Sequence, residues 1–228
     1  MHHRYLLAAA ALIVAGSAFA ADLPYSVKEA KTPPPEGLKE EIAKALGERS
    51  YQFVDEKGNL LCELWFRKEV PAKATPEQVK NGLTYRELPE GSLLGVVSFA
   101  KGASDYKKQK IKAGVYTLRL GFQPENGDHM GTAPYNEFCL LTPAADDKAL
   151  APLSAKDLQE SSTKASGTAH PSVLLLFPIS AKEAGAGAKV VDKGDGHFVL
   201  TLKLELKVGD QKVDFGIGLT LIGVSAGA

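Results

Sequence analysis

The clearest alternation of apolar and polar residues lies near the end of the chain. Between residues 200 and 208 a leucine or valine occupies every second position, with polar residues in between. A second alternating run spans 213–221, and Gly209-Asp210 separates the two runs. A period of two is typical of a strand with one buried and one solvated face, and a Gly-Asp pair favours a tight turn. The pattern therefore predicts an antiparallel hairpin.

Two glycines, Gly216 and Gly218, occupy alternate positions of the second run. They remove the side chains from one face of that strand. We therefore expect another chain segment or an aromatic ring to approach this face closely.

Other runs with strand-like patterns are separated by turn-forming residues. We expect strands at 50–54, 59–68, 93–99, 106–111, 115–122, 137–142 and 172–177. The turn cluster Asp55-Glu56-Lys57-Gly58 joins the first two into a hairpin. The run 93–99 is apolar on both faces, which suits a central strand that is covered on both sides.

Helical spacing is rare in this chain. Leu38, Ile42 and Leu46 are four residues apart and share one face of a short amphipathic helix, which we expect to end at Gly47. A second short helix is expected near 155–162, because the sequence beginning at Ser154 resembles a helix start. Residues 70–82 are expected to form a loop with room for one helical turn.

These patterns predict an all-β fold. Strands dominate from residue 50 to 222 without the alternation of strands and helices that parallel sheets require. We expect an antiparallel β-sandwich, Ig-like or jelly-roll, with one or two short peripheral helices. The expected organisation is a leader at 1–21, a Pro-rich lead-in with a short helix at 22–48, and a single β-sandwich domain at 49–228.

The first residues have the layout of a secretory signal peptide. His2, His3 and Arg4 precede an apolar run, and Ala18-Phe19-Ala20 has the small-x-small pattern of a cleavage site. The alternative is a membrane anchor, but the apolar run is shorter than the ~20 residues that span a bilayer. We therefore expect a periplasmic or secreted protein with no transmembrane segment after the leader is removed.

Composition and charge narrow the classes of partner. The 228 residues are 44% hydrophobic and 24% charged, as in an ordinary globular protein, and 27 Lys or Arg balance 27 Asp or Glu. Removing Arg4 with the leader changes this balance by one charge. A near-neutral chain has no overall attraction to nucleic acid, so we expect a protein, glycan or small-molecule partner instead.

The two cysteines, Cys62 and Cys139, both fall in predicted strands. An exported protein meets an oxidising environment, so a disulfide between them is one possibility. Two separate buried thiols are the other, because free cysteine packs well in a core.

The loop at 124–137 has the most site-like composition. Asp128 and His129 could ligate a divalent metal, with Glu137 or His170 completing the shell, since imidazole and carboxylate groups suit zinc or a similar ion. The alternative is an Asn-Gly turn in which Asp128 and His129 only bond the loop backbone. No other cofactor is indicated.

Two weaker candidates concern binding surfaces. Lys108, Lys110 and Lys112 are expected on one strand face with Tyr106, either as a small anion-binding patch or as a solvated edge that discourages aggregation. Tyr51 and Trp65 on the first hairpin could stack against a sugar, although core packing is the more common use of a single Trp.

The chain lacks the motifs that would name a reaction. It has no Gly-x-Ser-x-Gly elbow, no Walker loop and no dinucleotide-binding fingerprint. The stretch at 111–118, Ile-Lys-Ala-Gly-Val-Tyr-Thr-Leu, is similar to the "aGxYxL" strand of many bacterial exported β-sandwich modules of unknown function. That resemblance implies a strand after a Gly turn and transfers no active site.

Three functions follow from these observations. The leading hypothesis is a non-catalytic exported binding or interaction domain. The second is a metal-binding protein or metalloenzyme that uses the 124–137 loop, and the third is a carbohydrate-binding module.

Overall fold

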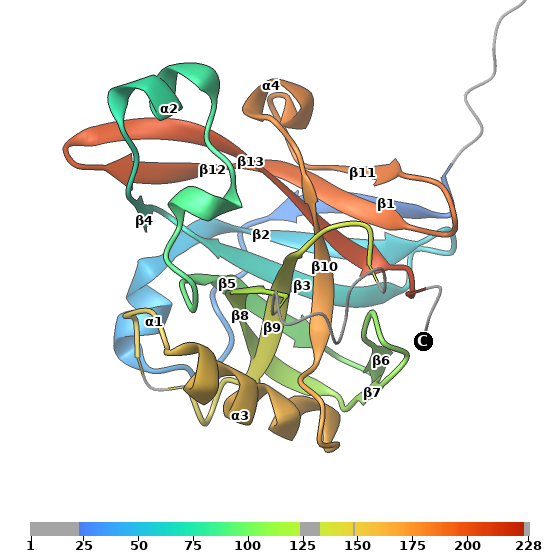
Figure 1. The fold of residues 1–228 in the computed structure, drawn as a ribbon. Helices are drawn as coiled ribbons and strands as arrows, with labels where there is room; N and C mark the ends of the chain where they lie inside the picture. Colours follow the sequence, from blue (N-terminus) through green and yellow to red (C-terminus); the bar gives the residue numbers. More distant parts are fainter. Residues whose placement is uncertain (1–22, 124–132, 148, 226–228) are drawn as a thin grey trace, which may run out of the picture.

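One long sheet of mixed pairing organises the chain (Figure 1). The computed structural model describes residues 23–123, 133–147 and 149–225. The predicted leader at 1–21 lies outside the described residues, and so do Asp128 and His129.

Strands make up most of the regular structure, and short helices connect some of them. In chain order the strands are β1 (Tyr25–Ala30), β2 (Leu46–Asp55), β3 (Leu60–Arg67), β4 (Val70–Ala72), β5 (Leu93–Phe99), β6 (Ala103–Ser104), β7 (Lys110–Ile111), β8 (Gly114–Phe122), β9 (Glu137–Pro143), β10 (Val173–Pro178), β11 (Lys189–Asp192), β12 (Phe198–Val208) and β13 (Gln211–Ile222). The helices are α1 (Glu40–Ala45), α2 (Pro76–Asn81), α3 (Ala155–Ser166) and α4 (Ala181–Ala184), with a 3-10 turn η1 (Tyr85–Glu87).

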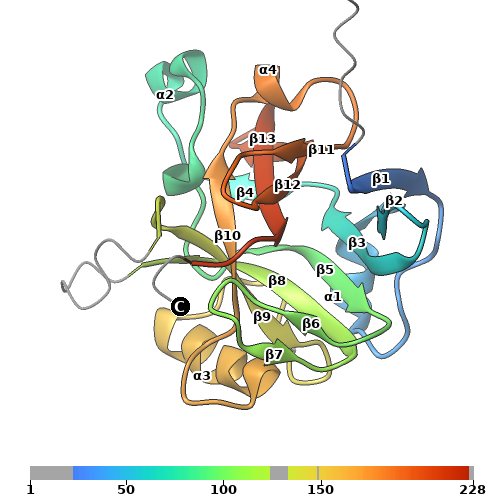
Figure 2. The same cartoon turned by 90° about the vertical axis from the view of Figure 1, so that its right-hand side faces the viewer.

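The main sheet has the order β1-β2-β3-β5-β8-β9-β10-β13-β12-β11, and it curls at β10. The first half of β10 pairs with β9 and the second half pairs with β13. Two limbs therefore face each other across the core, as Figure 2 shows. The fold is mostly β, as predicted. Because β10 belongs to both limbs, however, a sandwich of two separate sheets is not confirmed. The sheet is also mixed, since β4 runs parallel to β12.

The predicted C-terminal hairpin is confirmed in register and in turn. β12 pairs with β13 from Phe198↔Ile222 to Val208↔Gln211, and Gly209 has a φ of 59° in the turn between them. The close approach at Gly216 is also confirmed. A Cβ atom at this position would lie 2.4 Å from the Ile179 carbonyl oxygen, because the segment between β10 and α4 crosses over the strand.

An aromatic side chain also meets this strand. The buried hydroxyl of Tyr85 donates to the Phe177 carbonyl oxygen at 3.0 Å and accepts from the Gly218 amide at 3.1 Å. Tyr85 therefore ties β10 to β13 at the place where the sheet turns.

The N-terminal half contains the other predicted hairpin. β2 and β3 pair around a turn in which Gly58 has a φ of 79°. Residues 25–30, which lie in the predicted lead-in, form the edge strand β1 and pair with β2 along their whole length. The lead-in is therefore built into the sheet.

Two local predictions are wrong. Residues 106–111 do not form one strand. Asp105 accepts hydrogen bonds from the Lys107 and Gln109 amides and closes a turn in which Lys108 has a φ of 60°. Gly47 does not terminate α1 in a left-handed conformation, because the chain turns extended at Leu46 (φ −76°, ψ 149°) and enters β2 directly.

Three groups of buried apolar side chains fill the space around the sheet. The largest lies between the limbs and includes Phe53, Leu64, Leu118, Leu200 and Ile217. The second lies between the outer face of β9 and β10 and helix α3, and the third lies beneath α1. The sheet is therefore covered on parts of both faces, which explains why β5 is apolar on both sides.

The helices lie at the periphery, as predicted, but they are more numerous than the one or two expected. Helix α3 begins after Ser154, whose side chain accepts from the Asp157 amide, and extends four residues past the expected end. Helix α2 supplies the expected turn in the 70–82 loop, whereas nothing in the hydrophobic pattern predicts α4. None of the helices in the described ranges has the length and apolar character needed to cross a bilayer.

Candidate functional site

The structure separates the two predicted metal ligands that it describes. Residue pairing of β9 with β10 places Glu137 at one end of this ladder and His170 beyond the other, roughly 20 Å away by strand length. Glu137 instead pairs with Arg86 at 3.3 Å, and His170 is exposed. No group of three or more His, Cys, Asp or Glu within the described ranges could hold a metal ion.

The two cysteines are buried and free. Cys62 is on β3 and Cys139 on β9, three strand positions apart, which is roughly 14 Å along the sheet. Burial raises the pKa of both thiols well above the ordinary range for cysteine. Of the two possibilities, the structure therefore shows separate buried thiols.

The structure decides between the alternatives for the aromatic pair and the lysine patch. Trp65 is only 2% exposed, and its Nε1 donates to the Thr32 carbonyl oxygen at 2.8 Å, so it packs in the core. Tyr106 is buried, and Lys108 sits in the turn before β7. Core packing, one of the two alternatives for Trp65, is therefore confirmed, whereas Tyr106 and Lys108 do not share one strand face with Lys110 and Lys112.

Arg119 is the most conspicuous charged residue in the interior, but its hydrogen bonds are all used. Nε and Nη2 donate to the two carboxylate oxygens of Asp147 at 2.6 and 2.9 Å. Nη1 donates to the carbonyl oxygens of Gly91 and Ala151, and Nη2 also donates to that of Ala149. A guanidinium has five N–H groups, so none is left for a ligand. Arg119 therefore has a structural role.

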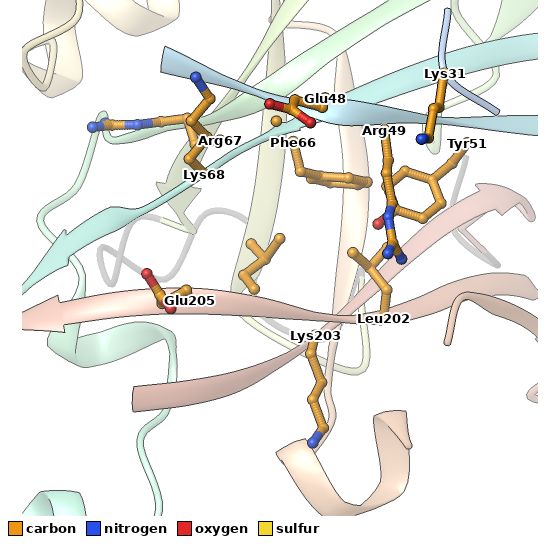
Figure 3. A pocket seen from close by; sticks show the side chains of 12 residues that line it. Lys31, Glu48, Arg49, Tyr51, Phe66, Arg67, Lys68, Leu202, Lys203 and Glu205 are labelled. Carbon is orange, nitrogen blue, oxygen red and sulfur yellow. The ribbon is translucent and has the colours of Figure 1, made fainter. Parts of the chain in front are cut away.

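A groove opens next to the place where the two edges of the curled sheet approach each other. It has a volume of about 540 Å³ and lies between β2 and β3 on one side and β12 on the other, as Figure 3 shows. We call it the seam groove. It is lined by Lys31, Gly47, Glu48, Arg49, Tyr51, Phe66, Arg67, Lys68, Leu202, Lys203, Leu204 and Glu205.

The seam groove exists because neither bordering strand is paired along its whole length. On β12, β11 pairs with residues 198–201 and β4 with residues 206–208, and among the described strands only β13 pairs with residues 202–205. On β2, the pairing with β1 stops at Ser50. Edge β1 lies beside edge β11, so the sheet nearly returns to itself and leaves this window.

A bulge shapes the β2 wall. Between the pairs Leu46↔Arg67 and Ser50↔Trp65, three residues of β2 lie opposite the single residue Phe66. Extra residues in one strand bend it and redirect its side chains. In Figure 3 the Arg49 side chain is directed from β2 toward β12.

The floor of the seam groove is apolar and aromatic. Phe66, Leu202 and Leu204 are at most 4% exposed and belong to the main core. The half-buried ring of Tyr51 meets Phe66 edge-on, with ring centroids 5.8 Å apart. Burial, with the nearby charge of Glu29, raises the pKa of Tyr51, so its hydroxyl stays protonated at neutral pH.

Basic residues outnumber acidic ones around this floor by five to two. Two of the cations are already paired, Arg49 with Glu29 at 3.0 Å and Lys203 with Asp214 at 2.8 Å. Lys31, Arg67 and Lys68 have no carboxylate within ion-pair distance among the described residues.

Arg67 is the half-buried member of these three cations. Its Nε is buried and has no hydrogen-bond partner in the described part of the chain. Burial, and secondarily the positive charge of Arg119, lowers the pKa of Arg67. In Figure 3 the Arg67 guanidinium is directed away from β12, so its buried Nε does not face the seam groove.

A second pocket of about 430 Å³ lies by the β2–β3 turn and the end of β13. It is lined by more apolar residues, including the exposed Leu60 and Val224. Ligand sites usually combine an apolar surface with several converging polar groups, and the seam groove fits this description better.

Sequence reasoning does not identify the seam groove. Its residues come from the lead-in and from three strands, and in the sequence each charged residue resembles one on an ordinary solvated face. The one available signal is Tyr51, which is predicted with Trp65 to form a stacking surface.

No protein-family model, curated protein or solved structure matches this chain. The functional conclusion therefore has to come from the geometry of the seam groove.

Proposed function

We propose that this chain is an exported, non-catalytic binding protein that holds an anionic ligand in the seam groove. The observation that carries the proposal is the surplus of basic residues in the lining around an apolar floor, with Lys31 and Lys68 lacking carboxylate partners among the described residues.

The size and chemistry of the seam groove support this function. Its volume of about 540 Å³ falls within the usual range for ligand sites, roughly 300–1,000 Å³. A carboxylate or phosphate would gain charge-assisted hydrogen bonds from Arg and Lys, while the apolar part of the ligand would cover Phe66 and Leu204.

The lining favours binding over turnover. It includes no His, Cys, Ser or Thr. Histidine is the commonest general acid or base, and serine, cysteine and threonine are common nucleophiles. The only acids in the lining are Glu48 and Glu205, and Glu205 pairs with Lys212 at 2.6 Å.

A direct test uses fluorescein-labelled octaglutamate and fluorescence anisotropy. We expect it to bind the mature protein and to bind a double variant, Lys31→Glu with Lys68→Glu, about tenfold or more weakly. Both lysines are exposed, but the Lys68 Nζ donates to the Lys44 carbonyl oxygen at 3.1 Å, so thermal unfolding of the variant accompanies the binding measurement. The matched control is Lys156→Glu with Lys164→Glu, which makes the same charge change on the exposed face of α3.

The comparison of the two variants decides the proposal. Loss of binding confined to the Lys31/Lys68 variant supports the seam groove as the site. Equal binding by both variants, or no binding by the wild-type protein, overturns the proposal.

A further inference from the structure

We propose that the ligand of the seam groove is an extended peptide that adds as a strand to residues 202–205 of β12. We call these residues the open edge. The inference rests on the proposed function and identifies its ligand as a peptide with alternating acidic and apolar residues.

The open edge supplies the backbone groups that such a peptide needs. Among the described strands, residues 202–205 pair only with β13, so their other side faces the seam groove. Backbone N–H and C=O groups of successive residues in a strand point alternately to its two sides. Two of the four residues therefore direct both backbone groups into the seam groove.

The neighbouring strands limit the length of the window. β11 stops pairing at Thr201 and β4 starts at Leu206, which leaves four residues, or ~13 Å of strand. A longer peptide must leave the window at its ends, so we expect about four of its residues to pair with the open edge.

The side-chain alternation of β12 determines what the peptide should contain. Leu202 and Leu204 point into the core, while Lys203 is exposed. A strand added alongside continues this alternation. Its inward side chains would lie over Phe66 and Leu204, which favours apolar residues. Its outward side chains would lie on the same face as the exposed Lys203, which favours carboxylates.

A lysine on an unpaired edge has another common use. Lysine can protect an edge strand from unwanted pairing with other chains. That alternative predicts that the open edge rejects any added strand, whatever its charge, and a competition experiment separates it from strand addition.

The test compares three probes by competition against a labelled octapeptide of alternating glutamate and valine. The first is the unlabelled peptide. The second is the same peptide with every second backbone amide N-methylated. It is prepared in two forms, methylated at odd or at even positions, so that one of them loses the N–H groups that face β12. The third is oligoacrylate with the same number of carboxylates, which has no amides.

We expect the unmodified peptide to bind most tightly. At least one methylated form should bind about tenfold or more weakly, and the oligoacrylate should also be weaker. If both methylated forms and the oligoacrylate bind within about twofold of the parent, strand addition is wrong while anion binding stands. If only the oligoacrylate binds, the edge is protected and the inference fails. If no probe distinguishes the wild-type protein from the Lys31/Lys68 variant, the proposed function fails as well.

Discussion

Arg119 and Arg67 lie close enough that the charge of one lowers the pKa of the other, yet their surroundings differ. All five N–H groups of Arg119 have partners, and its side chain and that of Asp147 are both fully buried. Arg67 has a buried Nε without a partner among the described residues and lines the seam groove. The two neighbouring arginines therefore differ in the number of satisfied donors.

The buried pair gives the first prediction. Asp147→Ala should lower the free energy of unfolding by about 3–5 kcal/mol, because it leaves the Arg119 charge buried and unpaired. Replacing both residues, Arg119→Met with Asp147→Leu, should recover part of this loss. Urea unfolding measures all three proteins. A loss below about 1 kcal/mol for the single variant would contradict the structural role.

Asp55 gives a prediction about pH. Its carboxylate accepts from the Asn59 side chain and from the Asn59 and Lys57 amides, and these bonds lower its pKa. A lowered pKa in the folded state means that the ionised form stabilises the fold above the usual aspartate range, and this stabilisation is lost as the pH falls through the folded pKa.

The stability difference between the wild type and Asp55→Ala should therefore be full near pH 7 and shrink on acidification below about pH 4. Thermal unfolding at a series of pH values measures it. A difference that stays constant over that range would show that the carboxylate charge is not involved.

At the scale of elements, close backbone approach explains why glycines recur in β13. A Cβ atom on residue 216 would lie 2.4 and 2.5 Å from the carbonyl oxygens of Ile179 and Ser180. These are backbone atoms of a crossing segment and cannot move aside without shifting it.

We therefore expect Gly216→Ala to destabilise the protein by about 1–3 kcal/mol, the usual cost of overpacking. The control is Gly187→Ala, where the nearest atom to a new Cβ is 3.8 Å away and the effect should stay within about 0.5 kcal/mol. Both are measured by urea unfolding. Equal effects would mean that the approach at Gly216 is not tight.

Alternation predicts the elements better than their ends. The β12–β13 and β2–β3 hairpins are predictable because apolar residues recur at every second position and the turns contain glycine. The strand expected at 106–111 does not form because Asp105 closes a turn there, which hydrophobicity does not reveal. The helix end expected at Gly47 is wrong because this residue lies in the bulge of β2.

At the scale of the whole molecule, the curl of the sheet creates the seam groove. A period of two identifies strands but contains no information on their order, and the order places Lys31 near Lys203. The β10 strand divides its pairing between two neighbours, and this division bends the sheet until β1 approaches β11. The site could not be predicted from the sequence because it depends on where that closure stops.

The central claim is that residues 202–205 of β12 form an open edge, and hydrogen exchange of their amides tests it most directly. Residue-resolved amide hydrogen exchange on the protein should show protection throughout 198–201 and 206–208, where β12 has partners on both sides. Within 202–205, two alternate amides should exchange much faster, and the alternating glutamate–valine peptide should slow them. Uniform protection across 198–208 without the peptide would contradict the account, because it would mean that the edge is already covered.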